Sequence, residues 1–495
     1  MIRSYLAIVC LATLATTDAQ DNPVRTMSLK ECVLIALQQA YDLQMSALDV
    51  RIASSQARGA EGAYDPVLTT SVSFSDTTAP GGFDTRTGTF VDSQSETIRG
   101  SVGVSGLLPS GGTYSVGASL TNTEGDSGGF PFSNASSQGP FIQIRQPLLE
   151  NFAIDDARLN IQLTRQSLQI SGFNLHQSML NTIGRVEDAY YDLAASKESV
   201  LVQEAALQLA EELAKDNRKR VTLGASAPLE EADAQAQAAA SRAAVISAKR
   251  LVRAAENNLK GAMVEDYAQW RQLSILPGSA LSRASSSPDF NESWTLAQQA
   301  RPDLLAFQVQ LDQQRLILHR RGNELLPQLD LTATAGLAGT ADELNQVYKQ
   351  IRRRDAPYYS LGLSLSLPFT NRREKENLRV AEAQTEQTKL RFRQLRQTIM
   401  IQVDDAVSQA ETNFQRLAAT AEAREFAEKA LTNERAKLIR GASTNFIVLQ
   451  HQRNLTAARS EELRSLTDYN KSLARLRFIE GSSLGTYQIN FTFTD

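Results

Sequence analysis

Two stretches decide the fold because they read alike: ALQQAYDLQ…YDPVLT in residues 36–69 and AQQARPDLL…LLPQLD in residues 297–330. In both stretches an aspartate stands 24 residues before a proline, first Asp42 and Pro66, then Asp303 and Pro327. The two copies are offset by 261 residues. Self-similarity at a fixed offset indicates one structural unit that occurs twice. We therefore predict a tandem duplication.

A second pair of similar segments lies farther along the chain, at an offset of 217 residues: LGASAPLEEA starts at Leu223 and RGASTNFIVL starts at Arg440. The two offsets differ by 44 residues, so the first copy contains extra chain. Most of that excess lies between Pro66 and Pro147, and its length matches one added β-hairpin with its loops. The motif PSGG at residues 109–112 supplies the turn of this hairpin.

Each copy is predicted to contain the same elements in the same order. A helix (28–62; 289–324) opens near a capping residue, Ser28 or Asn291, and a strand led by proline follows (67–76; 327–337). The first copy alone adds strands at 97–108 and 112–121, and a return strand closes each set (139–147; 358–367). A long helical tract (150–222; 372–440) then turns at Gly-Ala-Ser and returns as a shorter helix (228–262; 445–478).

We expect the following organisation from these elements. Residues 1–19 form a secretory signal peptide, 20–264 the first structural repeat, 265–288 a linker, 289–480 the second repeat, and 481–495 a C-terminal tail. No later apolar stretch is long enough for a transmembrane helix.

The lengths of the predicted elements favour association between copies of the chain. A helix of about 70 residues would be roughly 100 Å long, and its narrow apolar stripe needs partners along that whole length. The strands are about ten residues long and alternate between polar and apolar, as strands that cross an outer membrane do. Four to six strands cannot close a barrel alone, so a membrane barrel would be shared between subunits. The alternative is a soluble sandwich with a coiled-coil stalk.

The composition excludes several classes of function. The chain has 51 Lys and Arg against 55 Asp and Glu, so no basic footprint for nucleic acid exists. The isolated histidines, His176, His319 and His451, and the cysteines Cys10 and Cys32 cannot supply a closely spaced zinc site. No phosphate-binding loop, dinucleotide turn or nucleophile elbow occurs. We therefore expect neither an enzyme nor a cofactor, and Cys32 reads as a small apolar core residue.

Together these features resemble the TolC family of outer-membrane efflux channels. The best local marks are Ala300-Arg301-Pro302-Asp303-Leu304, the strands led by proline, Gln146-Pro147-Leu148-Leu149, and the paired Gly-Ala-Ser turns. The resemblance implies an α+β membrane protein that is the tandem-repeat subunit of a trimeric channel. Its strands would form a common β-barrel in the outer membrane, and its long helical hairpins a tunnel through the periplasm.

The resemblance also implies partners. Such a homotrimer docks on a periplasmic adaptor protein and an inner-membrane transporter, and it serves as the passive duct of a tripartite efflux or type I secretion system. The rival is a periplasmic coiled-coil adaptor or scaffold that conducts nothing. Adaptors usually carry one helical hairpin, whereas this chain has two joined by repeated strands.

Two groups of residues are candidate sites by this resemblance. The turns that would meet the adaptor are Leu223, Gly224, Ala225 and Ser226, and Arg440, Gly441, Ala442 and Ser443. The simpler structural reading is a hairpin whose glycine supplies a left-handed residue and whose Ser, Thr or Asn caps the next helix. Since Leu223 corresponds to Arg440, the two turns are not expected to dock identically.

Charged residues offer further candidates. Glu230 and Asp233 share a helix face and could attract cations at the tunnel entrance, or could simply complement a helix dipole. Arg352-Arg353-Arg354 is expected in a solvated loop between strands. Arg372-Arg373 falls in the first turn of a helix, where Glu374 or Glu376 could compensate the charge.

Overall fold

The computed structural model describes residues 24–80, 82–85, 88–127, 130–223, 227–278, 281–285 and 288–489. The predicted signal peptide lies outside these residues. The chain forms two compact units. The hairpin unit consists of Met1–Gln44, Ser178–Ala300 and Met400–Thr492, and the sheet unit of Met45–Gln177 and Arg301–Ile399 with the last residues of the chain.

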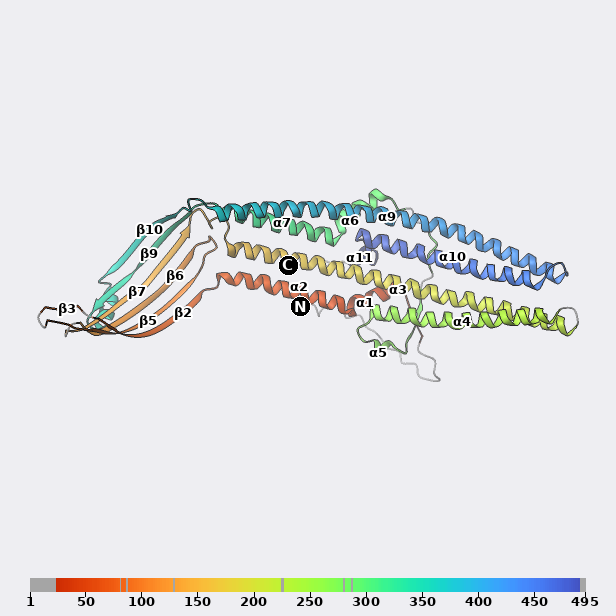
Figure 1. Cartoon of the computed structure of the whole chain (residues 1–495), viewed down its shortest axis with the longest axis horizontal. Helices are drawn as coiled ribbons and strands as arrows, with labels where there is room; N and C mark the ends of the chain where they lie inside the picture. Colours follow the sequence, from red (N-terminus) through yellow and green to blue (C-terminus); the bar gives the residue numbers. More distant parts are fainter. Residues whose placement is uncertain are drawn as a thin grey trace. The chain divides into compact units, whose positions relative to one another are not determined.

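Four long helices form two helix–turn–helix pairs (Figure 1). The first pair is α3 (Asp156–Thr222, 67 residues) with α4 (Pro228–Met263, 36 residues). The second pair is α9 (Arg372–Ile439, 68 residues) with α10 (Asn445–Glu480, 36 residues). The lengths match between the pairs, as expected for a duplicated element, although α3 begins six residues later than the predicted start at 150.

The shorter helices correct one prediction, because each predicted helix is broken in two. The breaks fall at Ala40 and Arg301, which are 261 residues apart and both have extended backbone. Pro302 explains the second break, since proline disfavours helical geometry in the residue before it. The resulting helices are α1 (Leu29–Gln39), α2 (Tyr41–Glu61), α6 (Phe290–Ala300) and α7 (Pro302–Asn323).

The caps of α1 and α6 also occupy equivalent positions. Ser28 caps α1 as predicted, and it forms a capping box with Glu31. The predicted cap Asn291 is wrong. Instead the Asp289 carboxylate accepts hydrogen bonds from the backbone N–H groups of Asn291 and Glu292, at 2.8 and 3.0 Å. Asp289 lies 261 residues after Ser28, so the duplication itself would have identified it.

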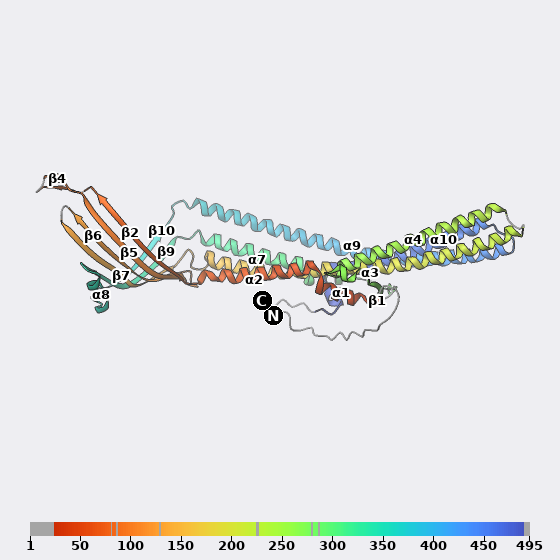
Figure 2. The same ribbon diagram turned by 90° about the horizontal axis from the view of Figure 1, so that it is seen from below.

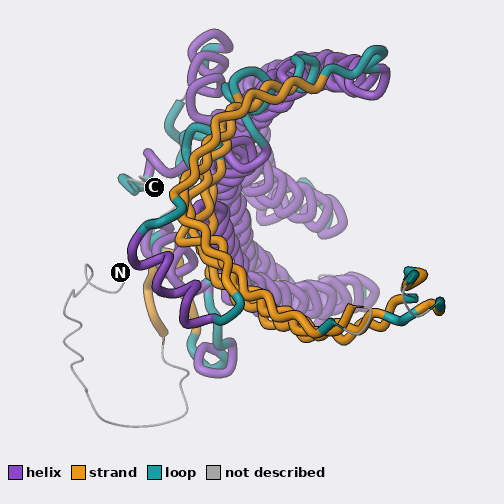
Figure 3. The backbone as a smooth tube through the Cα atoms, turned by 90° about the vertical axis from the view of Figure 1, so that its left-hand side faces the viewer, coloured by secondary structure: helices purple, strands orange, loops and turns teal. Residues whose placement is uncertain are grey.

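Six antiparallel strands form one sheet in the order β10-β9-β7-β6-β5-β2, and Figure 3 shows that the sheet is curved. Their bounds are β2 Val67–Ala79, β5 Ser93–Leu107, β6 Thr113–Ser127, β7 Pro131–Pro147, β9 Gln328–Ala341 and β10 Pro357–Ser366. The short strands β3 (Phe83–Asp84) and β4 (Thr89–Phe90) pair with each other. The hairpin predicted for the insertion is confirmed as β5 and β6, and both strands belong to the sheet.

One face of this sheet is apolar and exposed. The register pairs Val72 with Gly100 and Gly100 with Leu120, and side chains opposite each other lie on the same face. With a period of two along each strand, that face collects the exposed residues Leu68, Val72, Phe74, Ile98, Val102, Val104, Val116, Leu120, Ile142, Ile144, Leu361, Leu363 and Leu365. We call these residues the apolar face. Strand neighbours such as Ser73 and Ser364 point the other way.

A second correction concerns Arg352-Arg353-Arg354, which do not lie in a loop. Helix α8 (Leu344–Arg353) fills the connection between β9 and β10, and Arg354 ends it with left-handed backbone at φ 58°. Arg373, in contrast, pairs with Glu374 at 2.6 Å, one of the two carboxylates expected to compensate it.

The core of the hairpin unit joins distant parts of the chain. Met27 and Cys32 pack with Ile183, Leu259, Ile275 and Tyr487, among others. Cys32 is fully buried, as predicted, and burial raises the pKa of its thiol to about 12. Strand β1 (Val24–Met27) pairs in parallel with β8 (Ser274–Pro277), which brings the predicted linker into this core.

The linker is also held by polar contacts from the long helices. The Asn470 side chain accepts from the Ser282 N–H and donates to the Ser282 carbonyl, both at 3.0 Å. Lys197 donates to the Ile275 carbonyl at 2.6 Å, and the Ile275 N–H donates to Glu256 at 2.8 Å. The described part of the linker is therefore packed against the long helices of this unit, and it includes the short helix α5 (Tyr267–Trp270).

A carboxylate is buried in the same core. Glu187 accepts a hydrogen bond from the Tyr487 hydroxyl at 2.6 Å and pairs with Arg477 at 3.2 Å. Tyr487 follows the short helix α11 (Ser483–Thr486). Loss of solvation raises the pKa of Glu187 above its ordinary value of 4.5, against the opposing effects of Tyr487 and Arg477. Burial likewise raises the pKa of Tyr487.

Glu187→Gln should make the protein less sensitive to destabilisation as the pH rises above about 4.5. Because the pKa of Glu187 is raised on folding, the folded state keeps a proton that the unfolded chain has lost. The contribution of Glu187 to the free energy of unfolding is therefore most favourable below pH about 4.5 and is lost as the pH rises through the pKa of the folded state. Thermal melting at several pH values should show that the melting temperature of the variant rises relative to that of the wild type as the pH rises. Glu425→Gln is the control with the opposite sign, because Lys429 lowers the pKa of Glu425. Parallel melting curves for Glu187→Gln and wild type would contradict this account.

Candidate functional site

The turn between α9 and α10 has a defined backbone. Gly441 has φ +74°, its N–H donates to the Leu438 carbonyl at 3.1 Å, and the Ala442 N–H donates to the Lys437 carbonyl at 2.9 Å. This pair of bonds is a Schellman motif with glycine at its left-handed position. A side chain on Gly441 would meet nothing within 4 Å, so the backbone angle, not crowding, accounts for the glycine.

Ser443 does not cap the following helix, whose N-cap position is held by Thr444, one of the residue types predicted there. The Ser443 hydroxyl donates to the Glu434 carboxylate at 2.5 Å, and Lys437 pairs with the same carboxylate at 3.0 Å. The hydrogen bond from Ser443, helped by Lys437, holds the pKa of Glu434 below its ordinary value. The N-cap of α10 is Thr444, without a side-chain hydrogen bond. The turn is thus pinned to the end of α9.

The turn between α3 and α4 is described only in part. Leu223 ends the α3 side, and the remaining candidates Gly224, Ala225 and Ser226 lie outside the described residues. On the other side Ala227 is the N-cap of α4, again without a side-chain bond, and Pro228 takes the first helical position.

Exposed apolar side chains flank both turns. Leu223 and Leu229 are 83% and 70% exposed beside the first turn, and Ile439 and Phe446 are 78% and 68% exposed beside the second. We call these four residues the apolar tip. Of these four residues, only Leu223 is among the turn residues predicted from the sequence. The signal for the others is their position within about one helical turn of the paired Gly-Ala-Ser segments.

The first helical turns of α4 and α10 are linked by a polar contact. The Asn445 amide donates to the Glu230 carboxylate at 2.6 Å, and the Asn217 amide donates to the Glu230 carbonyl at 3.3 Å. Glu230 is half-buried, whereas Asp233 is exposed. The structure therefore gives the two acidic candidates different surroundings, and their role at an entrance stays a prediction.

The two helical hairpins pack on each other near their turns. Leu213 of α3, Leu431 and Leu438 of α9, and Val448, Leu449 and Leu455 of α10 form a buried cluster. The Gln452 amide adds a hydrogen bond to the Ala206 carbonyl at 3.0 Å. The two turns are consequently presented on one packed bundle of helices.

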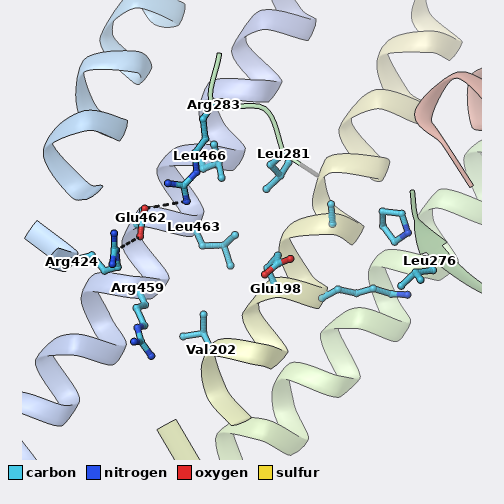
Figure 4. A pocket seen from close by; sticks show the side chains of 13 residues that line it. Glu198, Val202, Leu276, Leu281, Arg283, Arg424, Arg459, Glu462, Leu463 and Leu466 are labelled. Atoms are coloured by element: carbon cyan, nitrogen blue, oxygen red, sulfur yellow. Dashed lines mark ion pairs between the residues drawn. The ribbon is translucent and has the colours of Figure 1, made fainter. Parts of the chain in front are cut away.

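A pocket of about 630 Å³ lies farther from the turns in the same unit, and Figure 4 shows its charged lining. Arg283 and Arg424 both pair with the buried Glu462, at 3.2 and 2.8 Å. Arg459 lines the pocket as well and pairs with Glu428 at 2.9 Å. Each of these arginines thus has a carboxylate partner within the fold, although Glu462 is shared by Arg283 and Arg424 and Glu428 by Arg424 and Arg459.

In the described part of the chain, no group of three or more His, Cys, Asp or Glu side chains is suited to hold a metal ion. None of the helices formed by those residues combines the length and the apolar character required to cross a membrane.

The comparison with protein-family models decides the identity. The model described as "Outer membrane efflux protein" matches residues 34–263 and 294–482, which include both helical hairpins and all six strands of the sheet. The chain belongs to this family. It is thus an outer membrane efflux protein, from a family of channels and not of enzymes. The rival reading as a periplasmic adaptor is not favoured.

Solved structures of outer membrane channels and of another outer membrane protein share the fold. The CmeC outer membrane channel of Campylobacter jejuni is 15% identical, with a TM-score of 0.62 over 92% of this chain and 85% of that one. The outer membrane protein VceC of Vibrio cholerae is 16% identical, with a TM-score of 0.66 over 92% and 96%. The MtrE outer membrane channel of Neisseria gonorrhoeae is 18% identical, with a TM-score of 0.64 over 92% and 89%. No curated protein matches the sequence.

The conformation of the second turn predicts opposite effects for two glycine substitutions. Gly441→Ala forces a Cβ into left-handed backbone and should lower the free energy of unfolding by about 1–2 kcal/mol. Gly261→Ala is the matched control, because Gly261 lies in helix α4 with open space around its Cα and should gain about 0.5–1 kcal/mol. Denaturant unfolding of both variants measures this difference. Equal shifts in the same direction would show that the turn does not need glycine.

Proposed function

We propose that three copies of this chain form one passive export duct. The observation that carries the proposal is the open sheet: its outer strands β2 and β10 each pair on one side only. Unpaired backbone groups cannot remain in the hydrocarbon of a bilayer, and the apolar face is suited to lipid. Edge-to-edge joining of three identical sheets would pair every strand and give one common barrel, to which each chain contributes six strands.

The helices would continue the duct through the periplasm. Helices α3 and α9 have 67 and 68 residues, long enough for roughly 100 Å each. Exposed apolar residues along these pairs, such as Leu201, Ile246 and Met400, would be covered by neighbouring subunits. The duct contributes a conduit, whereas energy and substrate choice would come from an inner-membrane transporter in a tripartite efflux or type I secretion system.

The turns of the helical hairpins are the proposed docking site for a periplasmic adaptor. The apolar tip supports this role, because large apolar side chains at 68–83% exposure mark surfaces that a partner covers. The first turn begins with Leu223 and the second with Arg440, so the two turns would contact the adaptor differently. The docking surface comprises Leu223, Gly224, Ala225 and Ser226 with Arg440, Gly441, Ala442 and Ser443.

Trimer assembly in the membrane can be tested on adjacent residues of β2. Val72 belongs to the apolar face and Ser73 to the opposite face, and both are exposed in the single chain. Val72→Arg should destabilise the inserted protein by up to about 2–4 kcal/mol, because the charge would face lipid. Ser73→Arg should be tolerated, because it would face the water-filled lumen.

The measurement is membrane fractionation followed by electrophoresis with and without heating, which reports the amount of trimer. We expect less trimer for Val72→Arg and a normal amount for Ser73→Arg. A wild-type protein that is monomeric and soluble without detergent would refute the duct.

Docking can be separated from folding at Gly441. Both Asp and Asn tolerate left-handed backbone and have nearly the same size, so Gly441→Asp and Gly441→Asn should alter the turn equally. Only Asp places a negative charge in the docking surface. We expect Gly441→Asp to abolish drug resistance at an unchanged trimer level, with Gly441→Asn retaining resistance. Leu223→Asp and Leu223→Asn test the first turn in the same way, and full resistance in both Asp variants would refute docking by the turns.

A further inference from the structure

Helix α8 rests on the apolar face of the sheet instead of projecting away from it. Val347 is 1% exposed and packs over Gly339, where an added side chain would meet it at 3.2 Å. The Gln350 side chain accepts from the Thr340 N–H at 3.0 Å and donates to the Thr340 carbonyl at 3.1 Å. Figure 2 shows α8 beside β7 and β9. The helix is therefore fixed to the side of the sheet that would contact lipid.

A cavity of about 660 Å³ lies between this helix and the sheet. Its lining is largely apolar and comes from both partners: Val72, Val102 and Leu120 from the sheet, and Leu344, Tyr348 and Ile351 from the helix. Gly100 also lines the cavity, and a side chain there would meet nothing within 4 Å. The cavity thus has the chemistry and the room for part of an acyl chain.

The C-terminal end of α8 carries concentrated positive charge. Lys349, Arg352, Arg353 and Arg354 are exposed, and none of them forms an ion pair with the residues that the structure describes. The nearby acids are Asp355, which follows the helix, and Asp342 and Glu343 at its opposite end. Cations at a helix C-terminus suit the helix dipole, and these side chains can reach an anion at a membrane surface.

We propose that α8, the cavity and this basic end form a binding site for lipopolysaccharide of the outer leaflet. An acyl chain of its lipid A part would enter the cavity, and its phosphates would contact Arg352, Arg353 and Arg354. Charge complementarity and an adjoining apolar cavity together fit an anionic amphiphile better than either a soluble anion or a neutral lipid.

The position of α8 selects the outer leaflet. Strand β9 starts at Gln328, soon after helix α7, and α8 follows its far end at Ala341. Within the sheet unit, α7 and the first parts of α3 and α9 adjoin the near ends of the strands in sequence and would lead into the periplasm, so the far end of the sheet would lie toward the cell exterior. This step rests on the outer-membrane location of the protein. It does not depend on the trimer, because every residue of the site comes from one chain.

The test is native mass spectrometry of the full-length protein in detergent, titrated separately with lipid A, dephosphorylated lipid A and phosphatidylglycerol. We expect lipid A to bind best. R352Q/R353Q/R354Q should weaken lipid A binding by roughly 100-fold, because each basic residue near an anionic lipid surface raises the affinity by about five-fold. Gly100→Leu, which fills the cavity from a position with open space, should weaken it by about ten-fold.

The matched control removes three positive charges elsewhere in the same unit. K375Q/R391Q/R393Q changes exposed residues of α9 and should leave lipid A binding unchanged. Equal binding by wild type and R352Q/R353Q/R354Q, or an equal loss in the α9 control, would overturn the site. Equal affinity for phosphatidylglycerol would overturn the choice of lipopolysaccharide, and an unchanged affinity in Gly100→Leu would overturn the acyl-chain pocket. Far-ultraviolet circular dichroism confirms that each variant is folded.

Discussion

Backbone N–H and C=O groups on the outer sides of β2 and β10 have no partner within the sheet. In water such groups can be hydrated, but beside lipid each one costs several kcal/mol (roughly 2–7 kcal/mol). The apolar face makes burial in lipid favourable at the same time that the edges make it costly for a single chain. In the proposed trimer, identical neighbours would resolve this conflict, because the open edge of β2 in one copy would pair with the open edge of β10 in the next. The paired helices would then line up around the same axis as the shared sheet, because each chain carries both a sheet and two helical hairpins.

The duplication accounts for most of what the sequence could predict. Local signals act in both copies: alternation marks the strands, Gly-Ala-Ser marks the turns, and proline marks the break before α7. The offset of 261 residues predicts features that local patterns do not. It relates the cap Ser28 to the cap Asp289, and the helix break at Ala40 to the break at Arg301. No proline follows Ala40, so that break was invisible without the comparison between the copies.

Other features depend on contacts that no local pattern encodes. Helix α8 has only ten residues, and its apolar side chains are spaced for a face that exists only when the sheet is present. The pairing of β1 with β8 joins strands of four residues each that lie 250 positions apart. At the candidate site, the turn glycines were recognisable, but the contact between Glu230 and Asn445 arises from the packing of one hairpin on the other. This tertiary contact makes Glu230 half-buried, whereas Asp233 remains exposed to solvent.

The parallel pair of β1 and β8 has a consequence for how the chain matures. Val24–Met27 receive their partners only after Ser274–Pro277 have been made, and Met27 and Tyr487 share one core. A truncated polypeptide that lacks β8 therefore leaves Val24–Met27 without a strand partner, and one that lacks Tyr487 leaves their core incomplete. Closing so long a loop is entropically slow, although the equilibrium penalty grows only with the logarithm of its length. The burial of one end of the described chain thus depends on residues close to its other end.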